Sequence, residues 1–136
     1  MQGDVSKDAI TESVIAAAIE VHRALGPGLL ESAYKECLAL EFVARGILFK
    51  REQPLEIVYK STHVPVAAYR LDFVVDNRVV IEIKAQERLI PLYQAQLLTY
   101  LRIGKYSRGL LLNFGATRLA DGIKRVVNGW GEHESA

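Results

Sequence analysis

The pattern of hydrophobic and polar positions predicts two helices in the first third of the chain. Apolar residues recur at helical spacing from about Asp8 to Leu25, and again from about Leu29 to Arg45. Between them lies Gly26-Pro27-Gly28, and both glycine and proline end helices sharply. The residues expected to form the buried stripes are Ile10, Val14, Ala17 and Val21 in the first helix and Leu30, Tyr34, Cys37, Leu38 and Phe42 in the second.

The rest of the chain alternates between strand-like and helix-like patterns. Three strands are expected at Ile47 to Val58 (interrupted near Pro54), Val66 to Val75 and Val79 to Ala85. There follow a helix from Pro91 to about Arg102, a strand from Gly109 to Phe114, a short helix near Leu119 to Val127, and a frayed polar tail over residues 129–136. The order predicts one α/β domain covering residues 1–136, with a mixed four-stranded sheet flanked by helices.

Charged residues interrupt two of the apolar strands, at Asp72 in one and at Glu82 and Lys84 in the next. Side chains alternate between the faces of a strand, so the pairing register decides whether the three point to one place. A register that pairs Asp72 with Glu82 collects all the apolar residues of one face, namely Leu71, Phe73, Val75, Val79, Ile81 and Ile83. The opposite face then holds Asp72, Val74, Val80, Glu82 and Lys84.

The competing register comes from a two-residue turn at Asp76-Asn77, and it places Leu71 opposite Glu82. That register spoils the apolar face, so the sequence favours a three-residue turn over residues 76–78, with Asn77 or Arg78 in the left-handed region. We then expect the Cβ atoms of Asp72 and Glu82 to lie roughly 5 Å apart.

Two carboxylates at this separation repel each other unless a cation lies between them. Their oxygen atoms suit Mg²⁺ or Mn²⁺, and an adjacent lysine can orient or deprotonate a water and stabilise charge on a phosphate. Asp72, Glu82 and Lys84 together are therefore typical of metal-assisted phosphodiester hydrolysis. The alternative, which the three residues alone leave open, is a solvated strand face that carries a Glu–Lys pair.

Composition narrows the possible classes of protein. Half of the residues are hydrophobic and about a quarter are charged, as is usual for a globular protein, and the net charge is only +1. The low charge argues against a strongly electrostatic nucleic-acid binder, although residues 99–136 are more basic than the rest. Cys37 is the only cysteine, which excludes an intrachain disulfide framework and four-cysteine metal sites. No apolar stretch has the length of a membrane span, the N-terminus lacks the features of a signal peptide, and a cytoplasmic location is expected.

Three motifs in this order resemble a known group of enzymes. The αβββαβ order, with Asp72 on one strand and Glu82-Ile83-Lys84 on the next, resembles the PD-(D/E)XK nuclease superfamily and implies its restriction-endonuclease-like core. Gln96-Leu97-Leu98-Thr99-Tyr100 looks like the QxxxY motif of the RecB-type branch, and Gly28-Leu29-Leu30-Glu31-Ser32-Ala33-Tyr34 is similar to the signature of the GxxExxY proteins. The likeness extends through Asn113-Phe114-Gly115 and covers about nine-tenths of the chain.

The resemblance implies roles for the matched positions. Asp72 and Glu82 would bind Mg²⁺ or Mn²⁺ together with the carbonyl of Ile83, and Lys84 would orient the attacking water. Glu31 resembles the additional helical acid that reaches the metal through water in related nucleases. An acid at the start of a helix is also favoured by the helix dipole alone, so both interpretations of Glu31 stand.

The remaining motif residues divide between the site and the core. Gln96 and Tyr100 lie four residues apart, share a helix face, and would contact the water shell or the nucleic-acid backbone. Tyr34 is expected to pack against the sheet with its hydroxyl satisfied nearby, and His22 is expected to be a capping or core histidine. One departure is Tyr93, which stands where the family commonly has histidine.

Three functions follow from these expectations. The first is a metal-dependent nuclease acting on DNA, on single strands or ends. The second is a non-catalytic module that binds nucleic acid or protein and retains the nuclease fold, and the third is a metal-dependent hydrolase of a small phosphoester. A homodimer is compatible with the first two, because one small domain contacts few phosphates.

Overall fold

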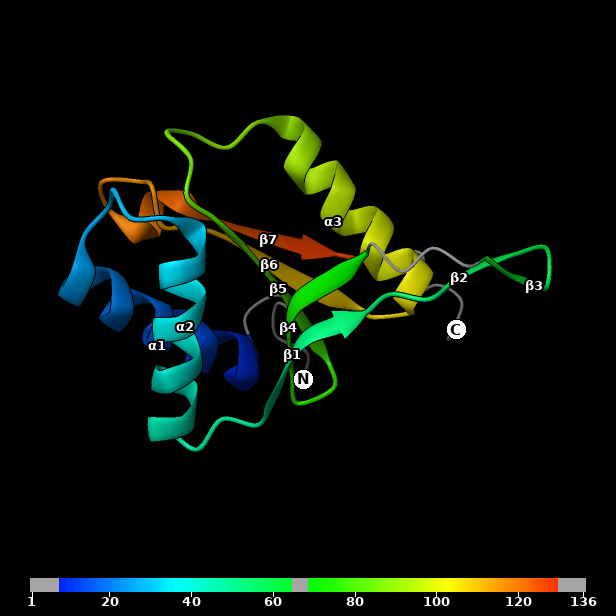
Figure 1. Cartoon of the computed structure of the whole chain (residues 1–136), viewed down its shortest axis with the longest axis horizontal. Helices are drawn as coiled ribbons and strands as arrows, with labels where there is room; N and C mark the ends of the chain where they lie inside the picture. The colour runs from blue at the N-terminus through cyan, green and yellow to red at the C-terminus, as the bar shows by residue number, and fades with distance from the viewer. Residues whose placement is uncertain (1–7, 65–68, 130–136) are drawn as a thin grey trace.

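The computed structural model describes residues 8–64 and 69–129. Its helices are α1 (Ala9–Leu25), α2 (Glu31–Ala44) and α3 (Pro91–Gly104), with a 3₁₀ turn at Leu119–Gly122. Its strands are β1 (Phe49–Pro54), β2 (Ile57–Tyr59), β3 (Thr62–Val64), β4 (Arg70–Val75), β5 (Val79–Lys84), β6 (Arg108–Asn113) and β7 (Ile123–Val127) (Figure 1). The three helices agree closely with the predicted segments.

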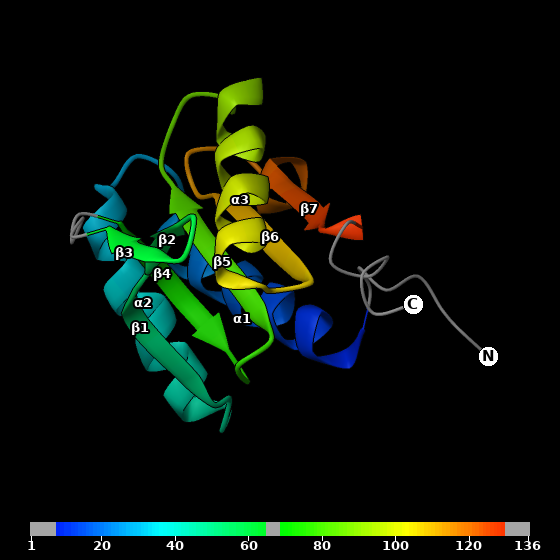
Figure 2. The same cartoon turned by 90° about the vertical axis from the view of Figure 1, so that its right-hand side faces the viewer.

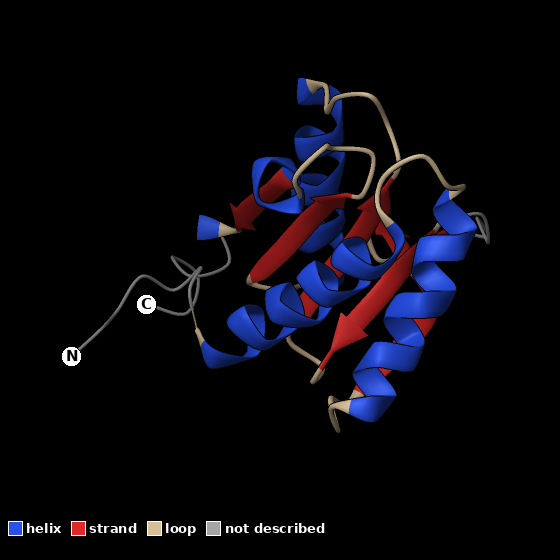
Figure 3. Ribbon diagram, turned by 90° about the vertical axis from the view of Figure 1, so that its left-hand side faces the viewer, coloured by secondary structure: helices blue, strands red, loops and turns tan. Residues whose placement is uncertain are grey.

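A five-stranded mixed sheet forms the centre of the fold, with the strand order β1-β4-β5-β6-β7. Only β5 and β6 are parallel, and α3 makes the crossover that connects them. Helices α1 and α2 cover one face of the sheet (Figure 3), and α3 covers the other (Figure 2). The layers confirm the predicted mixed α/β architecture and are consistent with a restriction-endonuclease-like fold.

The sheet has one strand more than the four predicted. The segment from Leu119 to Val127, expected to be a helix, is a 3₁₀ turn followed by β7, which pairs antiparallel with β6. The β-branched residues Ile123, Val126 and Val127 favour a strand, and the open edge of β6 supplies the hydrogen bonds. Both preferences outweighed the helix-like pattern of apolar residues, which covers only a short segment.

The predicted strand from Ile47 to Val58 is divided in two at Pro54, as the proline suggested. The first part is β1, which pairs with β4, and the second is β2, which forms a separate hairpin with β3. This hairpin projects from the body of the molecule (Figure 1). Residues 65–68, predicted to begin the next strand, lie outside the described residues, as does most of the predicted tail.

The predicted register of β4 and β5 is confirmed. Val75 pairs with Val79 and Phe73 with Ile81, around a three-residue turn closed by the Arg78 N–H donating to the Val75 carbonyl at 3.0 Å. Within the turn, Asn77 takes a left-handed conformation with φ of 56°. Asp76, rather than Arg78, is the second left-handed residue. Asp and Asn tolerate this conformation better than longer side chains do.

Two hydrophobic cores lie on opposite faces of the sheet. The core under α1 and α2 includes Val14, Ala17, Val21, Tyr34, Leu38, Phe42, Phe73, Val75, Val79, Ile81, Ile83 and Phe114. The smaller core under α3 contains Leu55, Leu71, Val74, Val80, Leu97, Leu101, Leu111 and Val126. Cys37 is only partly buried, at the margin of the first core.

Two predicted core positions are wrong. Leu71 belongs to the core under α3 and not to the face of Phe73, because the regular alternation of β4 is broken next to Asp72. The β1–β4 pairing also skips the position opposite Asp72, where Glu52 has φ of 49°. Leu30 is 78% exposed. Helix α2 begins at Glu31, so Leu30 precedes the helix and is not part of its buried stripe. Within the described residues, no helix has both the length and the apolar character needed to span a membrane.

Candidate active site

Asp72 and Glu82 lie where β4 and β5 separate. The regular pairing of the two strands ends at Phe73 and Ile81, one residue before the two acids. Beyond this point the Asp72 N–H donates to Glu82 Oε2 at 3.0 Å, and the Ile83 N–H donates to Asp72 Oδ2 at 2.8 Å. Each carboxylate therefore accepts a hydrogen bond from the backbone of the opposite strand, and the two acids are neighbours, as the register requires.

Glu82 has an unusual electrostatic environment. Burial, and next the charge of Asp72, raise the pKa of Glu82 to about 8, although the Asp72 N–H and the cations Lys84 and Lys35 favour the charged form. Such a shift is typical of an acid held beside a second acid with too little positive charge nearby. A cation bound at this place would relieve it.

Lys35 is a site residue that the sequence did not reveal. Its Nζ lies 2.8 Å from Asp72 Oδ1, 3.6 Å from Glu31 Oε1 and 3.8 Å from Glu52 Oε2. Burial opposes the charge on Lys35, but the hydrogen bond to Asp72 and the charges of the three acids together raise its pKa. In the sequence, Lys35 is only a lysine four residues after Glu31 on a helix, which is a common surface pattern.

Glu31 is linked to Asp72 through Lys35, which forms ion pairs with both acids. It lies in the first turn of α2 and forms an ion pair with this lysine. Within residues 8–64 and 69–129, no group of three or more His, Cys, Asp or Glu side chains is arranged to hold a metal ion. The structure thus brings Asp72 and Glu82 together and leaves Glu31 at the margin of the site.

The side chains of β5 and α3 enclose a small cavity of about 30 Å³. Its lining includes Glu82 and Lys84 from the strand and Tyr93, Gln96 and Tyr100 from the helix. The volume is that of one or two water molecules. Gln96 and Tyr100 therefore share a cavity with the acidic strand, where the helical spacing predicted them.

Tyr93 occupies the position where the family commonly has histidine, and it contacts Lys84. The Nζ of Lys84 lies 4.4 Å from the centre of the Tyr93 ring, which is within the range of a cation–π interaction. Such an interaction holds the ammonium without neutralising it.

Tyr100 lines the same small cavity as Glu82. Burial, and next the charge of Glu82, raise the pKa of Tyr100, with smaller effects from Tyr69 and Asp72. The hydroxyl therefore stays protonated at neutral pH and can donate a hydrogen bond within the site.

The end of β5 is fixed by a buried asparagine on the adjacent strand. Asn113 Oδ1 accepts hydrogen bonds from the N–H groups of Gln86 and Gly115, while its Nδ2 donates to the Gln86 carbonyl. The Phe114 N–H donates to the Lys84 carbonyl at 2.8 Å. A Cβ at Gly115 would lie 2.2 Å from the Gln86 carbonyl oxygen, so only glycine allows this approach. These contacts hold Lys84 in place on its strand.

Tyr34 and His22 are core residues, as predicted. The Tyr34 hydroxyl donates to the Gly26 carbonyl at 2.6 Å and accepts from the Leu29 N–H at 3.1 Å, and its ring stacks on Phe114. His22 is buried, with Nε2 lying 2.8 Å from the Ala116 carbonyl oxygen. Both residues stabilise loops and lie on the face of the sheet away from α3.

A mixed sheet whose central strands separate around two carboxylates, with a lysine two residues further on, defines a nuclease-like α/β domain. Over residues 8–126 the chain matches the family described as the PD-(D/E)XK nuclease superfamily, and it belongs to this superfamily. The comparisons gave no match to a curated protein or to a solved structure. The likeness to the GxxExxY proteins continues to rest on its motif alone.

Proposed function

We propose that the protein is a nuclease that hydrolyses phosphodiester bonds of DNA with the help of Mg²⁺ or Mn²⁺. Membership of the superfamily supports a nuclease-like function. The observation that carries the proposal is the pair Asp72 and Glu82 at the separation of β4 and β5, with Lys84 on the same strand. Asp72 is 8% exposed, and burying two neighbouring acids is costly, so such a pair is typical of a functional site.

The donor chemistry of the two acids fits a hard divalent cation. Asp72, Glu82 and the carbonyl of Ile83 would hold the ion through oxygen atoms, and Mg²⁺ characteristically keeps waters in its remaining positions. The raised pKa of Glu82 supports this fit, because its causes are burial and the charge of Asp72, and a bound cation would oppose both. When bound, the ion would supply charge neutralisation at the phosphate and a more acidic water. Glu31 would act through water, once Lys35 has moved.

The protein's own residues would perform the remaining steps. Lys84 orients the attacking water and stabilises the negative charge that grows on the phosphate. The water oxygen forms a new bond to phosphorus as the bond to the leaving oxygen breaks. One proton of the water passes to solvent, and the leaving oxygen takes up a proton from solvent. Gln96 and Tyr100 hold the water shell or the backbone of the substrate next to Glu82.

The second candidate is a binding module that retains the fold without turnover. The observation that favours it is the ion pair of Lys35 with Asp72, which already supplies one positive charge to the acids. The near-neutral net charge also limits how firmly the domain could hold a duplex. The third hypothesis is a hydrolase of a small phosphoester. It predicts turnover of a small substrate and no cleavage of DNA or RNA.

The test is a cleavage assay with labelled single- and double-stranded DNA and RNA, in Mg²⁺, Mn²⁺ or EDTA. We expect metal-dependent cutting of DNA that falls by about 10²–10⁴-fold in Lys84→Ala and Glu82→Ala. Cutting that survives both substitutions would contradict the assignment. Binding without cutting, in every metal and on every substrate, would establish the binding module instead.

A further inference from the structure

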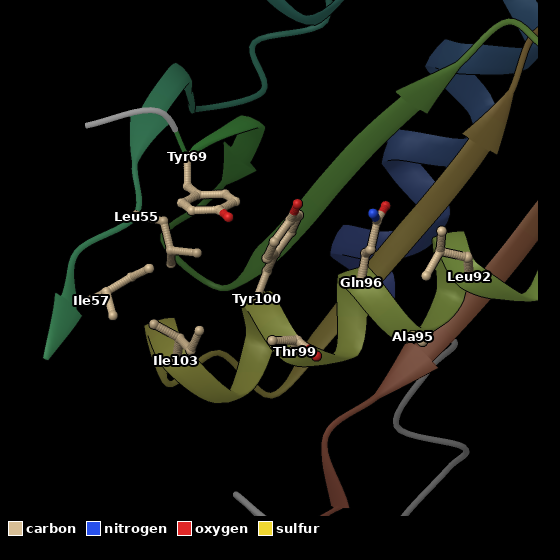
Figure 4. A pocket seen from close by; sticks show the side chains of 9 residues that line it. All are labelled: Leu55, Ile57, Tyr69, Leu92, Ala95, Gln96, Thr99, Tyr100 and Ile103. Carbon is tan, nitrogen blue, oxygen red and sulfur yellow. The ribbon is translucent and has the colours of Figure 1, made fainter. Parts of the chain in front are cut away.

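An apolar pocket of about 320 Å³ lies beside the candidate active site. It opens between the segment that carries Leu55, Ile57 and Tyr69 and the exposed side of α3 (Figure 4). The helix contributes Leu92, Ala95, Gln96, Thr99, Tyr100 and Ile103. Gln96 and Tyr100 also line the small cavity that contains Glu82 and Lys84, so these two side chains border both the pocket and the candidate site.

Two tyrosines form the aromatic part of the pocket. The ring centres of Tyr69 and Tyr100 lie 6.2 Å apart and the rings are inclined by 57°, so they do not stack on each other. Tyr69 is 43% exposed, which leaves much of its ring available to a ligand. Figure 4 shows both rings at the same end of the pocket, above the aliphatic side chains of Leu55 and Ile103. A planar ligand in the pocket could contact the ring of Tyr69 and the aliphatic side chains of Leu55 and Ile103.

The polar groups of the pocket lie at its edges. Among the described residues, neither the Gln96 amide nor the hydroxyls of Tyr69 and Tyr100 make a hydrogen bond with another residue. An amide can both donate and accept, and a tyrosine hydroxyl can do the same. An apolar floor with a few polar groups at the rim suits a ring that is apolar on its faces and polar at its edges.

The size and position of the pocket favour one base of the substrate strand. Its volume is at the lower end of the range for small-molecule pockets, which is room for a base and not for a duplex. A base next to Tyr100 would lie close to the candidate metal site, since Tyr100 and Glu82 line the same small cavity. Base stacking also provides affinity that does not depend on charge, in keeping with the net charge of +1.

We infer that this pocket binds one unpaired nucleobase of the substrate strand, with the face of the base against the exposed ring of Tyr69 and its edge toward Tyr100. The substrate is accordingly a single strand or an unpaired end, because a base within a duplex is held in its stack and must leave it to enter a pocket. The inference rests on the proposed function, since it takes the scissile phosphate to lie at Asp72 and Glu82.

The test measures binding of a short fluorescent single-stranded DNA in EDTA, which prevents cutting. The DNA is intact or lacks one base at successive positions, and the proteins are wild type, Tyr69→Ala and Tyr69→Phe. We expect Tyr69→Ala to weaken binding about tenfold and Tyr69→Phe to retain it. One abasic position should weaken wild-type binding at least as much, and it should cost Tyr69→Ala less than it costs the wild type, because the two changes share the contact between the base and Tyr69.

Other outcomes separate this inference from the proposed function. Equal binding of intact and abasic strands at every position by the wild type would overturn the pocket, whatever the variants do, and the nuclease assignment would remain. Tyr69-dependent binding without cutting in Mg²⁺ or Mn²⁺ would support the pocket and contradict the nuclease. A dimer that Tyr69→Ala dissociates, with DNA binding unchanged, would show that a second copy of the chain covers the pocket and would overturn the inference.

Discussion

The two faces of the sheet differ in how completely they are packed. The face under α1 and α2 has the larger core, in which Tyr34 is fully buried with both hydrogen bonds of its hydroxyl satisfied. The face under α3 has the smaller core, and there the half-buried Tyr100 borders a cavity and a pocket. The two motif tyrosines, Tyr34 and Tyr100, therefore have different environments: Tyr34 is enclosed in a core, and Tyr100 borders the candidate site.

The comparison shows that the electrostatically unfavourable burial of Glu82 lies on the less completely packed side of the sheet. The acids lie at the end of the β4–β5 pairing, at the edge of the less completely packed face. There, burial without full compensation raises the pKa of Glu82. Substitutions on the α1–α2 face should cost stability, whereas substitutions in the site should cost function and can even stabilise the protein.

The largest effect on stability is expected for Phe42→Ala. Phe42 is fully buried and contacts Phe49 and Phe73, with ring centres 5.3 and 5.4 Å away. Its truncation should lower the free energy of unfolding by roughly 3–5 kcal/mol. Urea unfolding measures this loss, and DNA cleavage by the fraction that stays folded should be unchanged. A loss below about 1 kcal/mol would show that this core tolerates cavities.

A smaller effect of opposite sign is expected for Glu82→Gln. The folded protein holds a proton on Glu82 up to a pKa of about 8, whereas the unfolded chain releases it near the ordinary glutamate pKa of 4.5. The folded state therefore binds more protons between these values, and its stability falls as pH rises through the range, by roughly 2–4 kcal/mol. Glu82→Gln should remove this fall and be the more stable protein at pH 8.

The measurement is urea unfolding in EDTA at several pH values from about 4 to 8. Glu56→Gln serves as control, because Glu56 is an exposed acid next to the β2–β3 hairpin, paired with His63. Parallel pH profiles for the wild type and Glu82→Gln would contradict the assigned environment of Glu82.

Next in size is the contrast between Tyr34→Phe and Tyr100→Phe. Removing the Tyr34 hydroxyl leaves the Gly26 carbonyl and the Leu29 N–H without their partner, which should cost about 1–2 kcal/mol of stability. Tyr100→Phe should change stability by less than about 0.5 kcal/mol and should slow DNA cleavage instead. Thermal unfolding and cleavage rates are measured for both variants. Equal effects on stability would contradict the different roles assigned to the two hydroxyls.

A modest effect on stability is expected for Lys35→Met, which tests whether the lysine substitutes for a cation. The ammonium lies 2.8 Å from Asp72, so its loss should destabilise the metal-free protein by about 1 kcal/mol, partial exposure limiting the cost. The same loss should tighten Mn²⁺ binding about tenfold, because the ion no longer competes with a fixed positive charge. Calorimetric titration measures the affinity, and weaker Mn²⁺ binding would show that Lys35 supports the ion.

Much of the site could be predicted because a strand has a strict period of two. Once the turn at residues 76–78 fixed the register, Asp72 and Glu82 had to be neighbours, and a helical spacing of four brought Gln96 and Tyr100 to one cavity. Lys35 could not be predicted, since only the packing of α2 against the sheet brings it to Asp72.

The errors in the fold have similar causes. Whether residues 123–127 form a helix or a strand depends on the free edge of β6, which is not a local property of those residues. Leu71 changed faces because the strand alternation fails beside Asp72, at the place where the site interrupts regular pairing. Local rules failed where distant segments, or the site itself, determined the outcome.

The most direct test of the account is a calorimetric Mn²⁺ titration of the wild type, Asp72→Asn, Glu82→Gln and the control Glu56→Gln. The account predicts saturable binding to the wild type and the control, strengthening as pH rises through the pKa of Glu82, since the ion displaces a proton. It predicts that Asp72→Asn and Glu82→Gln each weaken binding at least about tenfold. Equal affinity in all four proteins would contradict the claim that Asp72 and Glu82 form a metal site.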